Sequence, residues 1–388
     1  MAIDKPSSIH DESGIDTMSR RSFASSLLAA GFSFGSALAL TPDDVTAAKR
    51  DEVPIVVGYS KASDEPDNSH KKRVPARWYD RLSKARTEYE KFLNGAEIAS
   101  HRATDEAVTG VWVSAGSVDG QRPSLELEVT DSEPVPLGYL ESNGVPVTVR
   151  RVDASEGAPP ESRSGAGAEP DPEQLERNPG QKIGNGDGYN GTLGAPVRQS
   201  PTEEWHFLTC QHLGGGFEEG DSLYTSGSSS AAEIGTMIEV DCADDLAIAE
   251  AKNGYTPSRS IVDESETGIS GEFSKDGLAD LDEGDEEVKK SGQKTGVTSG
   301  KVKSHDGTAW VDKFSCPRRT NQLKWGTEED GAAGDSGAPV YTGPPHDSPA
   351  DWVWIAASQH AVRPWYLGDF VHGTAAWVLK EQYDWVFF

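Results

Sequence analysis

Three short segments of the chain each carry a residue that could take part in acyl transfer. Ser336 lies in a Gly-Asp-Ser-Gly stretch at 334–337, His212 follows an apolar run, and Asp245 precedes another. A serine hydroxyl is a poor nucleophile at neutral pH and needs a base such as histidine. The histidine in turn needs a carboxylate that fixes its tautomer and supports its charged form. These residue types predict a base, an orienting acid and a nucleophile, in that chain order.

The glycines around Ser336 predict a tight turn with an exposed backbone. Glycine adopts conformations that a Cβ obstructs, so the turn can present the hydroxyl outward. Its backbone N–H groups can also point at the carbonyl oxygen of a substrate. The same four residues fit an ordinary acidic loop, and the histidine and aspartate segments are what favour catalysis.

The elements that must position these residues are strands. From residue 183 onward the chain has many short apolar runs and many glycines, which is typical of an all-β sandwich or barrel. Residues 205–213 indicate an apolar strand that ends at His212, and 214–216 are three glycines. Residues 240–249 indicate an acidic turn that leads into a buried strand. Each candidate residue is therefore expected near a strand end.

In these segments the chain resembles the trypsin/chymotrypsin-like serine peptidase family, microbial type. The resemblance covers about residues 183–388 and rests on several motifs in family order. They are 208–212 (Leu-Thr-Cys-Gln-His), 245–248 (Asp-Leu-Ala-Ile), 334–339 (Gly-Asp-Ser-Gly-Ala-Pro), 294–302 (Lys-Thr-Gly-Val-Thr-Ser-Gly-Lys-Val) and 191–195 (Gly-Thr-Leu-Gly-Ala). Ala338 stands where the family has a second glycine.

The resemblance implies a role for each residue. His212 would be the general base and then the acid, Asp245 its orienter and Ser336 the nucleophile. The N–H groups of Gly334 and Ser336 would form the oxyanion hole, and Asp335 would hold the turn. Asp244 is a rival orienter, but only Asp245 is in the family register.

The implied fold is all-β, with two six-stranded antiparallel barrels and the site between them. Residues 375–388 fit the family's C-terminal helix, with Trp377, Tyr383, Trp385 and Phe387 packing it. A small α+β domain is expected in front of the barrels.

The resemblance also suggests a specificity pocket. Asp330 lies six residues before Ser336, where the family places the floor of the P1 pocket, and an acidic floor would favour Arg or Lys. The alternative is that Asp330 is one more acidic surface residue. Ser358 resembles a residue of the flanking strand, while His360 stands where the family has a small residue and could narrow the pocket. Ile183 faintly resembles the new N-terminus of an activated zymogen, whose amine would pair with Asp335.

Composition limits the partners. The chain has 388 residues, 64 acidic and 36 basic, and a net charge of −28. This charge would repel nucleic acid phosphates and is typical of halophilic, acidic proteins that stay soluble in high salt. Three cysteines, Cys210, Cys242 and Cys316, allow at most one bridge. A bridge between Cys242 and Cys316, with Cys210 free, is one open arrangement.

The N-terminal segment predicts export. Arg20-Arg21 is followed by a 14-residue apolar run at 27–40, too short for a comfortable membrane span, and by Ala37-Leu38-Ala39. This pattern resembles a twin-arginine (Tat) signal peptide, cleaved after Ala39. We divide the chain into 1–39 signal peptide, 40–74 polar flexible segment, 75–153 small α+β domain, 154–182 Pro/Gly/Glu-rich linker and 183–388 peptidase domain.

The sequence therefore predicts a secreted or cell-surface trypsin-like serine protease, a hydrolase that acts on protein or peptide substrates. It predicts no cofactor, no nucleic acid partner and no stable membrane span in the mature protein, and the histidines show no metal-ligand spacing. The alternative is a catalytically inactive trypsin-like fold that serves as a secreted binding protein. Nothing in the sequence indicates an oligomeric state.

Overall fold

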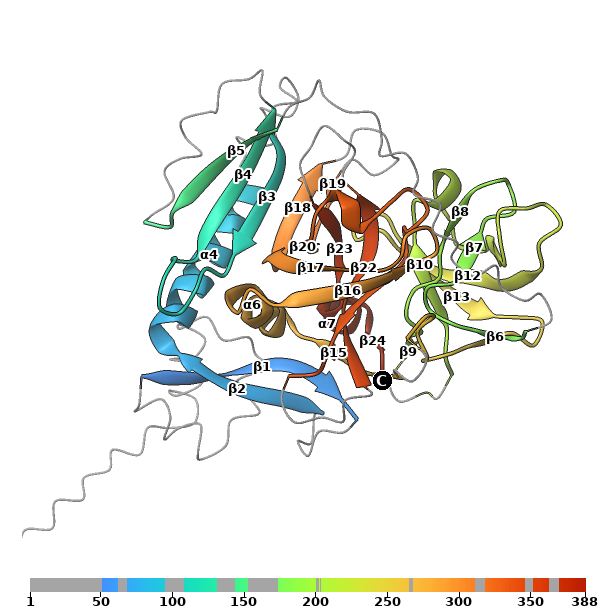
Figure 1. Cartoon of the computed structure of the whole chain (residues 1–388), viewed down its shortest axis with the longest axis horizontal. Helices are drawn as coiled ribbons and strands as arrows, with labels where there is room; N and C mark the ends of the chain where they lie inside the picture. Colours follow the sequence, from blue (N-terminus) through green and yellow to red (C-terminus); the bar gives the residue numbers. More distant parts are fainter. Residues whose placement is uncertain are drawn as a thin grey trace, which may run out of the picture.

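The fold is known from a computed structural model of the chain (Figure 1). The residues that it describes are 51–61, 68–94, 108–130, 144–152, 174–199, 202, 204–264, 268–310, 318–345, 352–362 and 370–388. The signal peptide at 1–39 and most of the linker at 154–182 lie outside them. Within these ranges no helix is long and apolar enough to cross a membrane.

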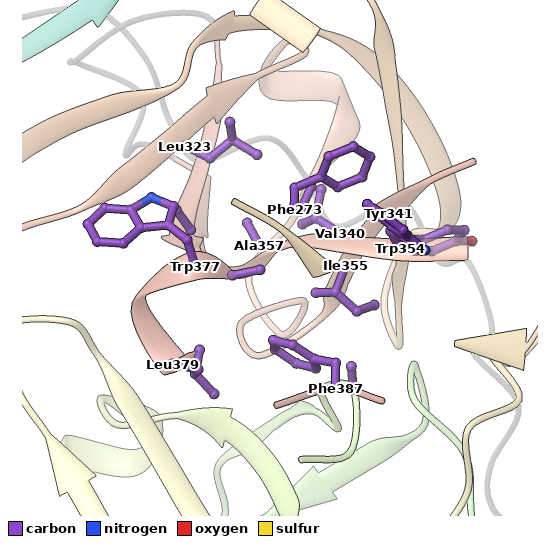
Figure 2. Close-up of a cluster of buried hydrophobic side chains, with 14 of the residues drawn as sticks. Phe273, Leu323, Val340, Tyr341, Trp354, Ile355, Ala357, Trp377, Leu379 and Phe387 are labelled. Atoms are coloured by element: carbon purple, nitrogen blue, oxygen red, sulfur yellow. The ribbon is translucent and has the colours of Figure 1, made fainter. Parts of the chain in front are cut away.

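Six strands form a closed antiparallel barrel in the C-terminal half. Its strands pair in the order β22-β21-β16-β17-β20-β23, and β23 pairs again with β22. Their bounds are Glu287–Gly292 (β16), Gly296–Ser304 (β17), Gln322–Trp325 (β20), Pro339–Thr342 (β21), Trp352–Val362 (β22) and Val371–Ala375 (β23). Val340, Tyr341, Ile355, Ala357 and Leu323 pack together in its interior (Figure 2).

Six further strands form a second, nearly closed antiparallel barrel beside it (Figure 1). They pair in the order β10-β13-β12-β11-β7-β8. Their bounds are Lys182–Gly184 (β7), Asn190–Thr192 (β8), Phe207–Cys210 (β10), Ser222–Tyr224 (β11), Glu233–Asp241 (β12) and Leu246–Ala251 (β13). Gly194 N donates to Leu208 O next to the gap between β8 and β10, at 2.8 Å. The predicted fold of two six-stranded antiparallel barrels is confirmed.

The C-terminal segment is a shorter helix than predicted. Helix α7 spans Trp377–Tyr383 and ends at Asp384, whose φ of 60° is left-handed. The chain then forms β24 (Trp385–Val386), which pairs with β9 (Arg198–Gln199) beside the other barrel. Trp377, Trp385 and Phe387 are buried, so the segment packs the two barrels together.

The segment at 40–74, which we expected to be flexible, contains two strands. β1 (Glu52–Ser60) and β2 (Ser69–Pro75) pair antiparallel, and β1 also pairs with β15 (Gly268–Phe273). β15 in turn pairs with β22 of the closed barrel. The expectation neglected the apolar residues Ile55 and Val57, which are buried in the structure. Burial of residues 54–57 of β1 fixes the hairpin.

The predicted α+β segment contains a helix and three strands, and its sheet also includes strands from the C-terminal half. Helix α4 spans Ala76–Asn94, and β3 (Val108–Ser114), β4 (Ser124–Thr130) and β5 (Val147–Val152) follow. Their sheet has the order β19-β18-β3-β4-β5, in which β18 (Asp306–Trp310) and β19 (Arg318–Arg319) come from the C-terminal half. The buried Lys324 Nζ also lies 2.8 Å from Glu128 of β4. Shared strands and a buried ion pair join this segment to the closed barrel.

Two short strands and one more α-helix lie outside the sheets described so far. β6 (Glu176–Arg177) pairs with β14 (Thr256–Pro257). Helix α6 (Lys275–Glu283) begins at Ser274, whose hydroxyl accepts from Gly277 N at 3.0 Å. α6 lies against β1, so it covers the junction between the N-terminal hairpin and the barrel.

We predict that the chain remains one particle after it is cut between 154 and 173. A specific protease site placed there and cleaved should leave two fragments that elute together, because β3–β18 and β1–β15 pairing spans the cut. Native size-exclusion chromatography measures this, and the same sample in denaturant is the control. Separation of the fragments in native buffer would contradict the shared sheets.

Candidate active site

The turn that carries Ser336 is held against the nearly closed barrel. Ala338 N donates to Asp335 O at 2.9 Å, and Gly337 has a φ of 94°. A Cβ on Gly337 would lie 2.2 Å from Thr192 O, so only glycine fits this approach. Thr192 N also donates to Ser336 O at 2.8 Å. The serine is thus fixed where the two barrels meet.

Strand pairing brings His212 and Asp245 together. β10 and β13 are antiparallel neighbours, with Cys210 opposite Leu246. His212 lies two residues beyond the end of β10, and Asp245 lies immediately before β13. Two residues that are 33 positions apart in the chain therefore meet at one edge of the barrel.

The three predicted catalytic residues form one continuous hydrogen-bonded line. Ser336 Oγ lies 3.1 Å from His212 Nε2, and His212 Nδ1 lies 2.6 Å from Asp245 Oδ2. Asp245 Oδ1 also accepts from His212 N at 2.9 Å, which fixes the carboxylate relative to the backbone. The distances match those of a nucleophile, a base and an orienting acid.

The carboxylate of Asp244 serves a different part of the fold. It accepts from Thr320 Oγ1 and Asn321 Nδ2 at 2.8 Å each, and from Tyr383 Oη at 3.0 Å. Asp245 is the fully buried member of the pair and has a left-handed φ of 53°. The turn therefore directs the two neighbouring side chains apart, and it is Asp245 that contacts His212.

The ionisation of His212 follows from its surroundings. Burial lowers the pKa of His212, but the contacts with Asp245 and Cys210 outweigh it and raise the pKa to about 10. A doubly protonated ring donates to Asp245 from Nδ1 and to Ser336 from Nε2. The serine hydroxyl then donates to His360 O, at 2.8 Å. Loss of the Nε2 proton frees that nitrogen to accept the serine hydroxyl, so the base form grows as pH rises.

Two backbone N–H groups at the turn are available for an oxyanion. Within the described residues, neither Gly334 N nor Ser336 N donates to a protein acceptor. Gly334 has a φ of 106°, and its carbonyl accepts from Thr192 Oγ1 at 2.9 Å. Both groups predicted for the oxyanion hole are therefore present and unpaired.

Asp335 is anchored by a buried lysine that the sequence analysis did not single out. Lys290 Nζ lies 3.1 Å from Asp335 Oδ2, and both side chains are fully buried. The backbone N–H groups of Lys294 and Ala332 also donate to this carboxylate, at 2.8 and 3.0 Å. Burial lowers the pKa of Lys290, and Asp335 counters that effect. Ile183, which we considered as a zymogen-type partner of Asp335, instead pairs with Gly191 inside β7.

The three residues suggested for a P1 pocket have separate environments. Asp330 is half-buried, and its Oδ2 accepts from Thr327 N at 2.7 Å in a short turn. Ser358 is buried beside Gly337 O, at 3.5 Å. His360 is also buried, and its ring is directed at Asp245, with Nδ1 2.7 Å from Asp245 Oδ2. Its side chain is therefore part of the Asp245 environment.

Arg319 is a second residue that sequence reasoning missed. Its guanidinium pairs with Asp245 Oδ2, and it is buried with its strand β19. His212, Asp245 and His360 are the one group of metal-ligand types gathered within 4.8 Å among the described residues. Because the guanidinium already lies on their shared oxygen, a metal cation would have to displace Arg319 from it.

The cysteines agree with the predicted limit of one bridge. Cys242 is disulfide-bonded, and Cys210 is free and buried. Cys316 lies outside the described residues. The free thiol lies at the end of β10, two residues before His212.

Comparisons with known proteins find solved proteases that are only weakly similar to this chain. The sequence matches no protein-family model and none of the curated proteins. A solved glutamic acid-specific serine protease is 15% identical over 55% of this chain and 100% of that one, with a TM-score of 0.39. Thermobifida fusca protease A is 17% identical over 54% and 97%, with a TM-score of 0.39. Nocardiopsis protease is 14% identical over the same shares, with a TM-score of 0.40. The chemistry of the site therefore rests on its own geometry.

We predict that Lys290→Met destabilises the protein and disorders the serine turn. It leaves the Asp335 carboxylate buried without its cation, which costs about 3–5 kcal/mol of unfolding free energy. Denaturant titration measures the loss. Lys289→Met is the matched control, because Lys289 is exposed beside Glu264 and should change the unfolding free energy by about 1 kcal/mol or less. Equal stability of the Lys290 variant and the wild type would refute the anchoring role.

Proposed function

We propose that the protein is a serine endopeptidase that hydrolyses peptide bonds through an acyl-enzyme. One observation carries the proposal: the line from Ser336 through His212 to Asp245 ends beside the two unpaired N–H groups of Gly334 and Ser336. A nucleophile, a base and an oxyanion site within reach of one carbonyl group are what acyl transfer requires.

The reaction follows from these positions. His212 Nε2 takes the serine proton as Ser336 Oγ attacks the carbonyl carbon, and the carbonyl oxygen becomes an oxyanion. The N–H groups of Gly334 and Ser336 donate to that oxyanion, and Asp245 stabilises the imidazolium. His212 then protonates the leaving amine, which leaves an acyl group on Ser336. Water, deprotonated by His212, repeats the sequence and releases the acid.

We predict that a fluorophosphonate probe labels the wild-type protein and that Ser336→Ala abolishes the label. The probe reacts only with a serine whose hydroxyl is activated by a base, so labelling reports the whole arrangement. His212→Gln should reduce the labelling rate by a factor of about 10³ or more. Intact mass and gel fluorescence measure both results, and Ser299→Ala, at an exposed position of β17, is the control that should still react.

A wild-type protein that does not react, while remaining folded, would contradict the proposal. That result would support the alternative of an inactive trypsin-like fold that binds a partner. The buffer should include molar salt as well as low salt, because the net charge of −28 makes the compact state self-repelling when unscreened.

The proposal extends to a preference for Arg or Lys before the cleaved bond. It is supported by the half-buried carboxylate of Asp330, with which no lysine or arginine pairs in the described part of the chain. We predict that Asp330→Asn lowers the ratio of kcat/KM for Arg- over Phe-containing peptides by about tenfold or more. Glu329→Gln is the matched control. Equal cleavage of both peptides by the wild type would reject this preference.

We also propose export by the Tat route, on the strength of Arg20-Arg21 and the apolar run that follows. We predict that a variant with both Arg20→Lys and Arg21→Lys accumulates inside the producing cell. Immunoblots of cells and medium measure this, with Lys5→Arg as the control. Unchanged secretion of the double variant would exclude the route.

A further inference from the structure

The Asp245 carboxylate has more partners than the triad requires. Besides His212, its Oδ2 contacts the Arg319 guanidinium, and His360 Nδ1 lies 2.7 Å from the same oxygen. All four side chains lie in the interior between the barrels, and Asp245, Arg319 and His360 are buried almost completely. Two potential cations thus share with the His212 ring one carboxylate oxygen, Asp245 Oδ2.

His360 is placed to act on both ends of the catalytic line. It lies on β22, and its carbonyl accepts from Ser336 Oγ at 2.8 Å while its ring faces Asp245. Its Nε2 contacts the hydroxyl of Thr374 on the neighbouring strand β23. The ring is therefore fixed from two sides, by a carboxylate and by a hydroxyl.

We propose that His360 and Arg319 are positioning residues that fix the Asp245 carboxylate and draw part of its negative charge away from His212. The inference rests on the proposed peptidase function and adds two residues to it. The side chains of both act through Asp245. Their contacts come from β22 of the closed barrel and from β19 of the five-stranded sheet, so the position of the acid depends on elements outside its own barrel.

The protons of His360 and of the Thr374 hydroxyl can be placed so that this role holds whether His360 is neutral or charged. The negative charge of Asp245, 2.7 Å from Nδ1, favours the forms of the ring that carry a proton on this nitrogen. Thr374 has one hydroxyl proton and two neighbours that could accept it, His360 Nε2 and Asp244 O. A neutral ring takes that proton at Nε2, whereas a charged ring donates to Thr374, which then donates to Asp244 O. The protonated Nδ1 lies beside the Asp245 carboxylate in both cases.

The expected effect on His212 has a definite sign. Asp245 raises the pKa of His212, and each further donor on the carboxylate weakens that attraction. The charged or titratable groups that face His360 are Asp245, Arg319 and His212. Removal of His360 or Arg319 leaves more charge on Asp245, so His212 should release its proton at higher pH.

The first test compares His360→Leu with His360→Asn in the full-length protein. Loss of the buried contact between His360 and the charged carboxylate should lower kcat about 10- to 100-fold, with KM changed by about threefold or less. The acid limb, which is the pH range in which kcat/KM falls as the pH is lowered, should also move to higher pH. Asparagine places a donor near the position of Nδ1, so it should restore most of kcat and the original limb. His206→Gln is the control, since this buried histidine packs on Trp385 and does not contact Asp245.

The second test uses Arg319→Met and Arg319→Lys. Methionine removes the cation, and the acid limb should move up by about one pH unit, whereas lysine should keep it near the wild-type position. If the leucine and methionine variants fold and lose kcat with no shift of the limb, the two residues are structural supports only and the inference fails. The same follows if His360→Asn behaves like His360→Leu.

Failure of this inference is distinguishable from failure of the proposed function. A wild-type protein that does not react with the fluorophosphonate refutes the peptidase itself. A wild type that reacts and cleaves, with His360 and Arg319 variants of unchanged kcat and pH profile, refutes only the positioning role. Circular dichroism and the thermal midpoint of each variant identify any that do not fold, and for those the conservative variants Asn and Lys decide.

Discussion

The structure of the site depends on keeping one carboxylate ionised in the interior. Burial raises the pKa of Asp245, but its contacts with His212 and His360 outweigh burial and hold the pKa well below its usual range. A buried charge is tolerated only when donors and opposite charges compensate it. Here the compensation comes from the end of β10, from β19 and from β22, which are far apart in the chain. The active site can therefore form only when both barrels are folded against each other.

Strand β22 connects this requirement to the rest of the molecule. It pairs with β21, which follows the serine turn, with β23, which carries Thr374, and with β15. Through β15 it is continuous with the N-terminal hairpin, and β18 joins the other N-terminal strands to the closed barrel. The strand that holds His360 thus takes backbone hydrogen bonds from β15, β21 and β23, and the N-terminal hairpin is joined to it through β15. Any movement of the N-terminal part acts on the same sheet that positions the acid and the nucleophile.

The parts of this site that the sequence predicted are those whose signals are local. His212, Asp245 and Ser336 each lie in a short motif at a strand end, and the two-barrel fold followed from the same motifs. Arg319, Lys290 and the role of His360 depend on pairing between distant strands, for which no local pattern exists. The resemblance to the family motif directed attention to Ser358. In the structure, the pairing of β22 with β23 has a register shift between Gln359 and Ala361. Residues two apart lie on one face of a strand, so a small register difference decides which of them reaches Asp245.

The hairpin at 52–75 shows the opposite difficulty. The polar composition of the whole segment 40–74 predicted flexibility, because composition averages over a segment and cannot show that Ile55 and Val57 meet the core. The net charge of −28 is also an average over the whole chain, and it does not show where the few basic residues lie. Arg319, Lys290 and Lys324 are buried against Asp245, Asp335 and Glu128, respectively. Salt screens exposed charges strongly and buried pairs much less. An acidic surface can therefore change its interactions with ionic strength while the three interior pairs continue to hold the acid, the serine turn and the N-terminal sheet in place.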